Sequence, residues 1–333
     1  MMEYNEFKNI VELTFKNYLP EPYCNMKCVI HKVDKVNRTV DAFNFFPDKN
    51  GMNVTPTMYI NDMYEHYKVT GDLNEVFESA AAKLVEAVKD ANKIASCIDY
   101  SKANEKIVFQ LINTEQNKEM LKDVPHREFQ DLSIIYKWVV NREKDGVASI
   151  LVRNDLAERL GFNEMELYKI ALENTKEIFP PTIKPMTEVI MEIFMKNGAP
   201  DGMFGMTFGD IPPNEQMYVI SNDVGINGAI SMLYTDGLDE LAKQVESDLY
   251  IMPSSVHETI AISTDMGEPE ELAKMVSEIN MDQVSLGDRL SNQVYHYDKD
   301  LQTITLATHT PNKRLDGIVA EQNKLYDTNK PSR

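Results

Sequence analysis

Two cysteines near the N-terminus are the first side chains in this chain that could bind a metal. Cys24 and Cys28 are separated by three residues, a spacing that differs from a zinc knuckle, and no second cysteine pair follows. An isolated pair of this kind is typical of one buried cysteine and one loop cysteine. The sequence therefore predicts no metal at this position.

A second cluster combines carboxylate and imidazole side chains. Asp62, Glu65 and His66 fall within about one helical turn and could face the same side of a helix. No other predicted helix offers a matching His-x-x-x-His or Glu-x-x-His pattern, which a metal site between helices needs. A solvated helix face explains the cluster better, and we expect neither a metal nor a cofactor.

The stretch Ser254-Ser255-Val256-His257-Glu258 contains the side-chain types of a hydrolase triad. A triad requires that these side chains converge from separate elements beside an oxyanion hole. Neighbouring residues on a strand alternate between its faces and cannot converge. The stretch therefore predicts a turn between two strands.

The remaining candidate depends on how two strands are arranged. Ser221, Asn222 and Asp223 follow one predicted strand, and Ser254 and Ser255 follow another. If these strands are neighbours, the five polar side chains gather at one edge of the sheet, where they could bind a ligand or a peptide. The alternative is that they are ordinary loop residues. We take this polar edge as the candidate binding site.

Composition restricts the class of protein and its partners. The formal net charge of −19 disfavours nucleic acid and anionic membranes as partners. A hydrophobic content of 43% is enough for a sizeable core in a chain of 333 residues. Three cysteines, the lack of a signal-peptide pattern and the lack of a long apolar run predict a soluble protein of the reducing cytoplasm.

The elements that position these residues are clearest in the middle of the chain. Residues 132–140 and 147–152 are rich in β-branched and aromatic side chains around the turn dipeptide Asp145-Gly146, which predicts a hairpin. A short helix ending at Gly161 follows. A second helix begins after Asn163, because Asn163 and Glu166 have the spacing of a capping box.

These two helices around a glycine turn resemble a helix-turn-helix. A recognition helix needs basic side chains to meet phosphates, whereas residues 163–176 contain three glutamates against two lysines. We therefore expect a helical hairpin packed on a sheet.

The rest of the chain divides around a connector rich in glycine and proline. We predict an N-terminal α+β domain at 1–196 that includes the helical hairpin 154–179, a connector at 197–213 and a C-terminal domain at 214–309. The C-terminal domain has the predicted order ββαββαββ, with its second strand at 228–234. Residues 310–333 lack periodicity and predict a disordered tail. The predicted fold class is α+β, with mostly antiparallel sheets, helices packed on one face and two subdomains.

Parts of the chain resemble known families. The hairpin, the helical stretch 154–175 and the later stretches 228–233 and 249–255 resemble the YtpQ-like proteins of Firmicutes, with Ile170-Ala-Leu-Glu-Asn-Thr175 as the most specific phrase. Residues 54–64 resemble a neighbouring uncharacterised family of gut Clostridia that is often met on mobile elements. Together the resemblance covers about residues 25–308. Ser255 departs from the YtpQ-like pattern, which has a basic residue there.

Neither family carries an assigned activity, so the resemblance implies fold and compartment only. The sequence favours a non-enzymatic protein that acts through protein contacts, as an accessory protein of a mobile element. Two alternatives stay open: a hydrolase or transferase with a site at the strand ends, and an acidic mimic of DNA. The oligomeric state and the partner do not follow from the sequence.

Overall fold

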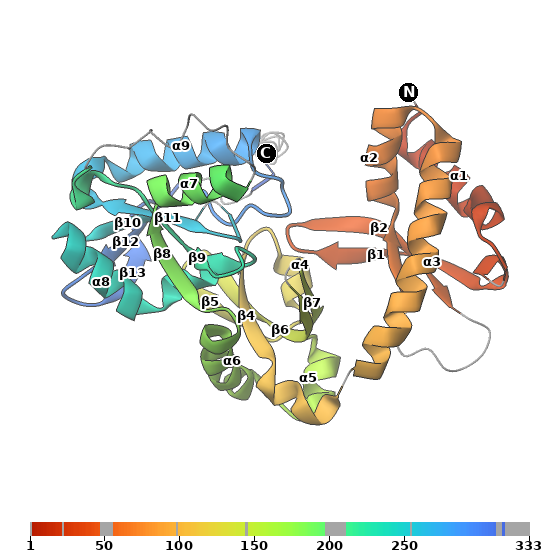
Figure 1. Cartoon of the computed structure of the whole chain (residues 1–333), viewed down its shortest axis with the longest axis horizontal. Coiled ribbons are helices and arrows are strands. Elements are labelled where there is room, and N and C mark those ends of the chain that lie inside the picture. Colours follow the sequence, from red (N-terminus) through yellow and green to blue (C-terminus); the bar gives the residue numbers. More distant parts are fainter. Residues whose placement is uncertain are drawn as a thin grey trace, which may run out of the picture. The chain divides into compact units, whose positions relative to one another are not determined.

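The computed structural model describes residues 2–21, 23–46, 56–97, 99–143, 146–196, 211–253, 255–310 and 315–316 (Figure 1). Contacts divide the chain into two compact units. The first contains Met1–Lys102 with Val140–Ser149, and the second contains Ala103–Val139 with Ile150–Arg333.

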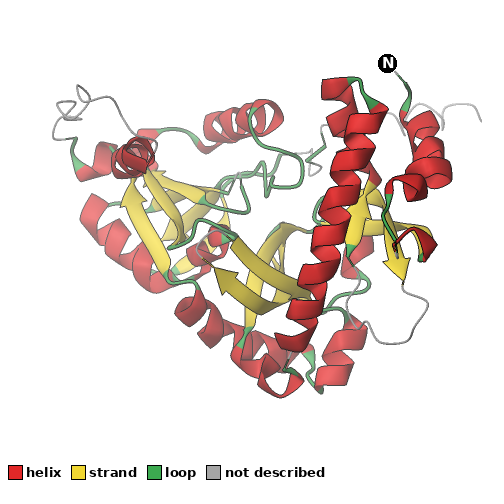
Figure 2. Ribbon diagram, turned by 45° about the vertical axis from the view of Figure 1, so that its right-hand side comes forward, coloured by secondary structure: helices red, strands yellow, loops and turns green. Residues whose placement is uncertain are grey.

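The described part of the first unit packs helices, red in Figure 2, on a three-stranded antiparallel sheet of order β1-β2-β3, drawn in yellow. Its elements are α1 (Tyr4–Thr14), β1 (Lys27–Lys35), β2 (Arg38–Phe46), β3 (Thr57–Tyr59), α2 (Ile60–Thr70) and α3 (Leu73–Cys97). Strands β1 and β2 form a hairpin, and Asn37 takes the positive φ of 64° that its tight turn requires. The core is aromatic, with Phe7, Phe15, Phe43 and Phe77 at most 2% exposed.

The second unit begins with a small sheet in which β4, β6 and β5 lie side by side; β7 also pairs with β6, although the end of β6 and most of β7 fall within Val140–Ser149 of the first unit. The elements are β4 (Ile107–Asn113), α4 (Lys118–Leu121), β5 (His126–Phe129), β6 (Leu132–Glu143), β7 (Gly146–Leu151), α5 (Asn154–Leu160) and α6 (Glu164–Ile178). The predicted hairpin is confirmed, although Asp145 lies outside the described residues. Strand β5 was not predicted from the sequence.

Helix α6 begins where the sequence places it. The Asn163 side chain accepts a hydrogen bond from the Glu166 N–H, and the Glu166 carboxylate accepts one from the Asn163 N–H. Gly161 ends α5 with a φ of 76°, as expected for a glycine C-cap. The predicted helical hairpin packed on a sheet is confirmed, because α6 lies against β4.

The contact between α6 and β4 satisfies the free edge of the small sheet. Thr175 Oγ1 accepts a hydrogen bond from the buried Phe109 N–H at 2.9 Å and donates one to the Ala171 carbonyl. Asn174 Nδ2 donates to the Ile107 carbonyl at 3.0 Å. An unpaired strand edge would otherwise bury backbone groups without partners or offer them to another chain.

The larger sheet of the second unit has six antiparallel strands in the order β13-β12-β10-β11-β9-β8. Its elements are β8 (Pro181–Pro185), α7 (Met186–Lys196), β9 (Tyr218–Asn222), α8 (Thr235–Val245), β10 (Leu249–Met252), β11 (Thr259–Ser263), α9 (Pro269–Asp282), β12 (Tyr295–Asp298) and β13 (Thr303–Leu306). Together with the first unit, it confirms the predicted α+β class with mostly antiparallel sheets.

Strand register assigns helices to the two faces of this sheet. Lys184, Val219, Ile260 and Met252 lie in one cross-strand row and therefore share a face. Glu192 of helix α7 forms an ion pair with Lys184 on this face. Helix α9 packs against Met252 and Ile262 on the same face. Helix α8 covers the opposite face, where Gly237 approaches Ile183. Figure 1 shows α7 and α9 on one side of the strands and α8 on the other.

Two sequence predictions in this region differ from the structure. Residues 228–234 are not a strand, because Gly228–Leu233 form a 3-10 helix that starts after Asn227 at a φ of 53°. Gly228–Met232 are buried in the 3-10 turns, and a short apolar run does not by itself distinguish a buried strand from a buried helical segment. The ββαββαββ order is therefore wrong at its second strand. Strand β8 was missed because Pro181 and Pro185 bound it, and prolines are tolerated there since β8 is an edge strand.

The compact units do not follow the predicted domains. Strands β8 and β9 come from opposite sides of the predicted connector 197–213 and pair over five residues. Most of that connector lies outside the described residues. In the predicted tail, Leu315 is 2% exposed, and its carbonyl accepts a hydrogen bond from Arg289. The fold therefore includes residues that the sequence assigned to the tail.

A half-buried carboxylate joins the two sheets of the second unit. Asp131, in the turn between β5 and β6, accepts hydrogen bonds from Ser291 Oγ at 2.6 Å and from the hydroxyl of Tyr295 on β12. Complete burial and the Asp131 charge raise the pKa of Tyr295. Asn113 Nδ2 adds a hydrogen bond to the Leu290 carbonyl at 3.1 Å. These contacts place the small sheet against the loop that precedes β12.

Replacing Thr175 tests whether α6 satisfies the β4 edge. We expect Thr175→Val to lower the free energy of unfolding by about 1–3 kcal/mol, because the buried Phe109 N–H loses its acceptor while the side-chain shape is kept. Thr175→Ser keeps the hydroxyl and should cost clearly less. Urea unfolding of the three proteins measures both changes. Equal stability of the valine and serine variants would contradict the role of the hydroxyl.

Candidate functional site

The predicted polar edge lies at one end of the six-stranded sheet. Strands β9 and β10 both pair antiparallel with β11, so they run parallel and finish at the same end. They are not neighbours, because β11 lies between them. Ser221, Asn222, Asp223 and Ser255 thus lie at the same end of the sheet, and Ser254 lies outside the described residues.

The described polar side chains at this edge hold loops in place. Asn222 Oδ1 accepts hydrogen bonds from the N–H groups of Val224 and Gly225, and its Nδ2 donates to the Ile226 carbonyl at 2.9 Å. Ser221 Oγ donates to the His257 carbonyl at 2.8 Å. These contacts are typical of side chains that cap a strand end.

Ser255 and Asp223 also make contacts at this end of the sheet. Ser255 Oγ accepts a hydrogen bond from the His257 N–H at 3.0 Å, and Ser255 forms an isolated bridge with Arg289. The Asp223 N–H donates to the Pro180 carbonyl at 3.1 Å. The edge is therefore built from backbone links among loops, with its side-chain oxygens largely used inside the protein.

His257 is the one imidazole that contributes to this edge in the described residues. Its Nδ1 accepts a hydrogen bond from the Asn227 N–H at 3.2 Å, so Nε2 carries the proton and lies 3.4 Å from Asp288 Oδ1. Ser221 bonds to the carbonyl of His257 and not to its ring. The ring is thus arranged as a structural link. The predicted turn between β10 and β11 is confirmed.

A glycine is required at position 228 because Ser221, Asn222 and His257 lie very close to its backbone. A Cβ atom at Gly228 would lie 2.3 Å from Ser221 Oγ, 2.5 Å from the His257 carbonyl oxygen and 2.8 Å from the Asn222 nitrogen. Two of these three atoms belong to the backbone and cannot move separately from the strand and loop. The edge and the 3-10 helix therefore pack without room for any side chain at this position.

Substitution of Gly228 tests this packing. We expect Gly228→Ala to destabilise the protein by about 1–3 kcal/mol, the usual cost of overpacking, seen as a lower urea midpoint. Gly267→Ala is a matched control, because a Cβ there meets only Leu272 at 3.7 Å. A Gly228→Ala variant as stable as Gly267→Ala would show that the edge can open at little cost.

A charged network that the sequence did not reveal surrounds Glu164 at the start of α6. Arg127 on β5 donates two hydrogen bonds to its carboxylate, at 3.0 and 2.9 Å, and the Tyr136 hydroxyl on β6 donates a third at 2.6 Å. The Arg127 guanidinium also lies 3.7 Å from the centre of the Tyr168 ring. Burial raises the pKa of Glu164, but the hydrogen bonds from Arg127 and Tyr136 outweigh it and hold the pKa below its usual value.

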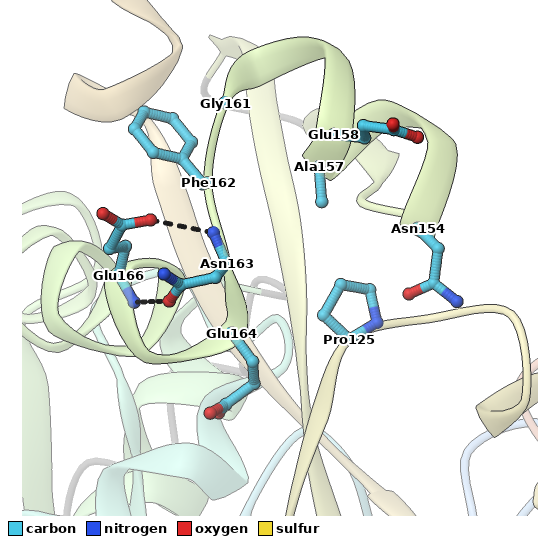
Figure 3. A pocket seen from close by; sticks show the side chains of 9 residues that line it. All are labelled: Pro125, Asn154, Ala157, Glu158, Gly161, Phe162, Asn163, Glu164 and Glu166. Carbon is cyan, nitrogen blue, oxygen red and sulfur yellow. Dashed lines mark hydrogen bonds between the residues drawn. The ribbon is translucent and has the colours of Figure 1, made fainter.

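An open pocket of about 560 Å³ lies between the start of α6 and α5 (Figure 3). Its lining is Pro125, Asn154, Ala157, Glu158, Gly161, Phe162, Asn163, Glu164 and Glu166. Glu164 is bound by Arg127 and Tyr136, and Figure 3 shows Glu166 turned back to Asn163. Glu158 is left exposed. The pocket could accept a cationic group, but two of its three carboxylates already stabilise the fold.

Neutralising Glu164 tests the network and its pH dependence. The folded pKa lies below the unfolded value of about 4.3, so the network stabilises the protein above that pH and is lost as pH falls through the folded pKa. We expect Glu164→Gln to cost about 1 kcal/mol at pH 7, since Arg127 and Glu164 are partly exposed, and to cost little at pH 3. Glu158→Gln should change stability at neither pH. A Glu164→Gln penalty that is equal at both pH values would refute the ionic contribution.

The other residues singled out by the sequence lie apart from these sites. Asp62, Glu65 and His66 lie on α2, where Glu65 pairs with Lys68 at 2.6 Å and His66 lies 4.0 Å from Glu75. Cys24 and Cys28 are free thiols, and burial raises the pKa of Cys28. Within the described residues, no group of three or more histidine, cysteine or acidic side chains could hold a metal ion.

Helices α7 and α9 expose an unusual amount of apolar surface. No residue of α7 is buried, although Met186–Lys196 is strongly apolar. We call the exposed apolar side chains of the two helices the α7–α9 surface; they are Met191, Ile193, Phe194, Met195, Met275, Ile279 and Met281, between 37% and 57% exposed. A set of this kind on one face of a sheet is more than the scattered apolar residues of an ordinary surface.

Fold and sites together define an α+β protein of antiparallel sheets in which the described polar clusters serve structure. Across the described ranges, no helix is long and apolar enough to cross a membrane. Residues 4–299 match a family of unknown function, DUF5688, and the chain belongs to this family. No curated protein and no solved structure matches the chain. The expected membership in an uncharacterised family is thereby confirmed, and the relation to the YtpQ-like proteins of Firmicutes stays a prediction.

Proposed function

We propose that this protein is a non-enzymatic interaction protein that binds a partner through the α7–α9 surface. The observation that carries the proposal is that α7 buries none of its side chains while Phe194 and Met195 are 46% and 57% exposed. Exposed apolar sets on monomers mark interaction sites more often than they mark any other function. Methionine and phenylalanine are enriched at such interfaces.

Charge around the surface indicates the chemistry of the partner. Helix α9 carries four acidic residues, Glu270, Glu271, Glu278 and Asp282, against the single Lys274. On α7, Glu188 and Glu192 share one lysine, Lys184 of β8. An apolar surface rich in methionine with an acidic border fits a cationic amphipathic helix, because flexible thioethers adapt to apolar side chains while carboxylates attract lysine and arginine.

The setting of this interaction rests on less direct observations. The free thiols Cys24 and Cys28 support a reducing, cytoplasmic location. The resemblance of residues 54–64 to proteins of mobile elements supports a role as an accessory protein of such an element.

A defined peptide tests the interaction without an unidentified partner. The probe is a labelled amphipathic helix of about 18 residues, with leucine on one face and lysine on the other, followed by fluorescence anisotropy. We expect it to bind, and we expect Phe194→Ser with Met195→Ser to weaken binding at least about 10-fold, because both are large exposed apolar side chains of α7. Binding should fall as salt rises.

Three controls make the result specific. Leu301→Ser removes a 70% exposed apolar side chain in the turn between β12 and β13 and should leave binding unchanged. A peptide with glutamate in place of lysine should not bind. The double variant Asp223→Ala with Ser254→Ala tests the polar edge; if it abolishes binding while the α7 variant does not, the interaction lies at the edge and the α7–α9 surface is the wrong site. Absence of peptide binding to the unaltered protein also overturns the proposal.

A further inference from the structure

Strand β1 has an open edge. It is the outer strand of the sheet of order β1-β2-β3 and lies beside β2 (Figure 1). Across the described ranges, the backbone hydrogen bonds of Lys27–Lys35 run to β2, and none joins the other edge of the strand. None of these nine residues is buried. The backbone groups at this edge are therefore within reach of another molecule.

A hydrogen bond of β2 identifies the β1 residues that face this edge. The Asp41 N–H donates to the Asn61 side chain at 2.8 Å, on the β3 side of β2 and away from β1. Asp41 lies opposite Lys32, so this pair is not hydrogen-bonded and the Lys32 N–H and carbonyl point outward. Bonded and unbonded pairs alternate along an antiparallel ladder. The outward-facing residues of β1 are therefore Cys28, Ile30, Lys32 and Asp34.

Several other edge strands in the described structure are short, bounded by proline or covered. Strand β3 has three residues, and β5 and β13 have four each. Pro181 and Pro185 bound β8, and Thr175 of α6 satisfies β4. Strand β1 has nine residues, no proline and an unbroken register with β2. A long, regular edge of this kind accepts an extended peptide as an additional strand.

The charge of β1 is opposite to that of the whole chain. The strand contains Lys27, Lys32 and Lys35 against the single Asp34, whereas the formal net charge of the chain is −19. Lys27 and Lys32 are exposed, and the Lys35 ammonium lies 3.3 Å from the centre of the Tyr59 ring. Opposite charges on neighbouring strands attract. The edge therefore favours a strand that carries carboxylates.

We propose that β1 is a docking edge for an acidic, extended segment of a partner protein, which adds to the β1-β2-β3 sheet as a fourth strand. The backbone of the segment forms hydrogen bonds with the outward N–H and carbonyl groups of β1, and its carboxylates pair with Lys27 and Lys32. The backbone supplies most of the affinity, and the lysines select for acidic sequences.

A second copy of β1 fits this edge less well than an acidic segment does. Two β1 strands that pair antiparallel over their full length place Lys27 of each copy opposite Lys35 of the other. Like charges directly opposite each other destabilise a sheet. The edge is also independent of the α7–α9 surface, because β1 belongs to the first compact unit and both helices belong to the second.

A defined peptide tests strand addition. The probe is a fluorescein-labelled peptide of ten residues in which valine and glutamate alternate, followed by anisotropy. We expect it to bind, and the same peptide methylated on every backbone nitrogen should bind at least about 10-fold more weakly, because it keeps the charge but loses the donors. A peptide with lysine in place of glutamate should not bind. Equal affinity of the methylated and unmethylated peptides would overturn strand addition.

Two substitutions at Lys32 separate the backbone contact from the charge. Proline is tolerated where the N–H of an edge strand points outward, so Lys32→Pro should fold while it removes one donor and obstructs the edge. We expect it to weaken binding at least about 10-fold. Lys32→Ala keeps the N–H and removes only an exposed charge, so it should weaken binding less than about 5-fold. Equal effects of the two substitutions would contradict the proposal.

Amide hydrogen exchange in the unaltered protein gives a readout that does not depend on variants. The valine–glutamate peptide should slow exchange at Cys28, Ile30, Lys32 and Asp34 and leave the Val29 amide, which is already bonded to β2, unchanged. No slowing at millimolar peptide would overturn the proposal. Protection of the same four amides that grows with protein concentration, without peptide, would identify a second copy as the occupant and exclude the acidic partner.

One further variant separates this edge from the proposed function. Phe194→Ser with Met195→Ser alters the α7–α9 surface and should leave binding of the valine–glutamate peptide unchanged. Loss of binding in this variant would place the peptide on α7 and overturn the assignment to β1.

Discussion

The second unit depends on the Asp131 carboxylate between its two sheets. A carboxylate in this position would be costly alone, and it is retained because Tyr295 and Ser291 both donate to it. The contact fixes the β5–β6 turn against the loop before β12. That turn sets the register of β6, and β6 carries both Tyr136, which meets α6, and Lys137, which lies on the opposite face. These two hydrogen bonds thus hold the strand that carries the Tyr136 end of the Glu164 network.

Elements defined by neighbouring residues could be predicted from the sequence, and elements defined by distant contacts could not. The capping box of Asn163 and Glu166 and the helix end at Gly161 are local, and both are as expected. The edge strand β8 exists because β9 pairs with it from the far side of the connector. Residues 228–233 become a 3-10 helix because Gly228 must pass within contact distance of Ser221 and His257.

The same distinction explains the candidate sites. Polar residues at the ends of β9 and β10 could be identified in the sequence, yet the intervening β11 and the hydrogen bonds of Asn222 depend on the complete sheet. Lys137 stands within the apolar run 132–140, where the sequence indicates only a half-buried strand. The network of Glu164 with Arg127 appears only when α6 and β5 are brought together. Ile170–Thr175 is the most specific segment of the resemblance, and it has a structural role. Asn174 and Thr175 form hydrogen bonds with backbone groups at the edge of β4.

Leu315 limits how far the C-terminal end of this chain can be truncated. Its carbonyl accepts from the buried Arg289 guanidinium, and its N–H donates to the Gln116 side chain in the turn after β4. A truncated version ending at residue 310 would leave a guanidinium in the interior with one acceptor fewer, and would expose the apolar surface that Leu315 covers. Expression of a shortened protein therefore requires that the chain continue beyond Leu315.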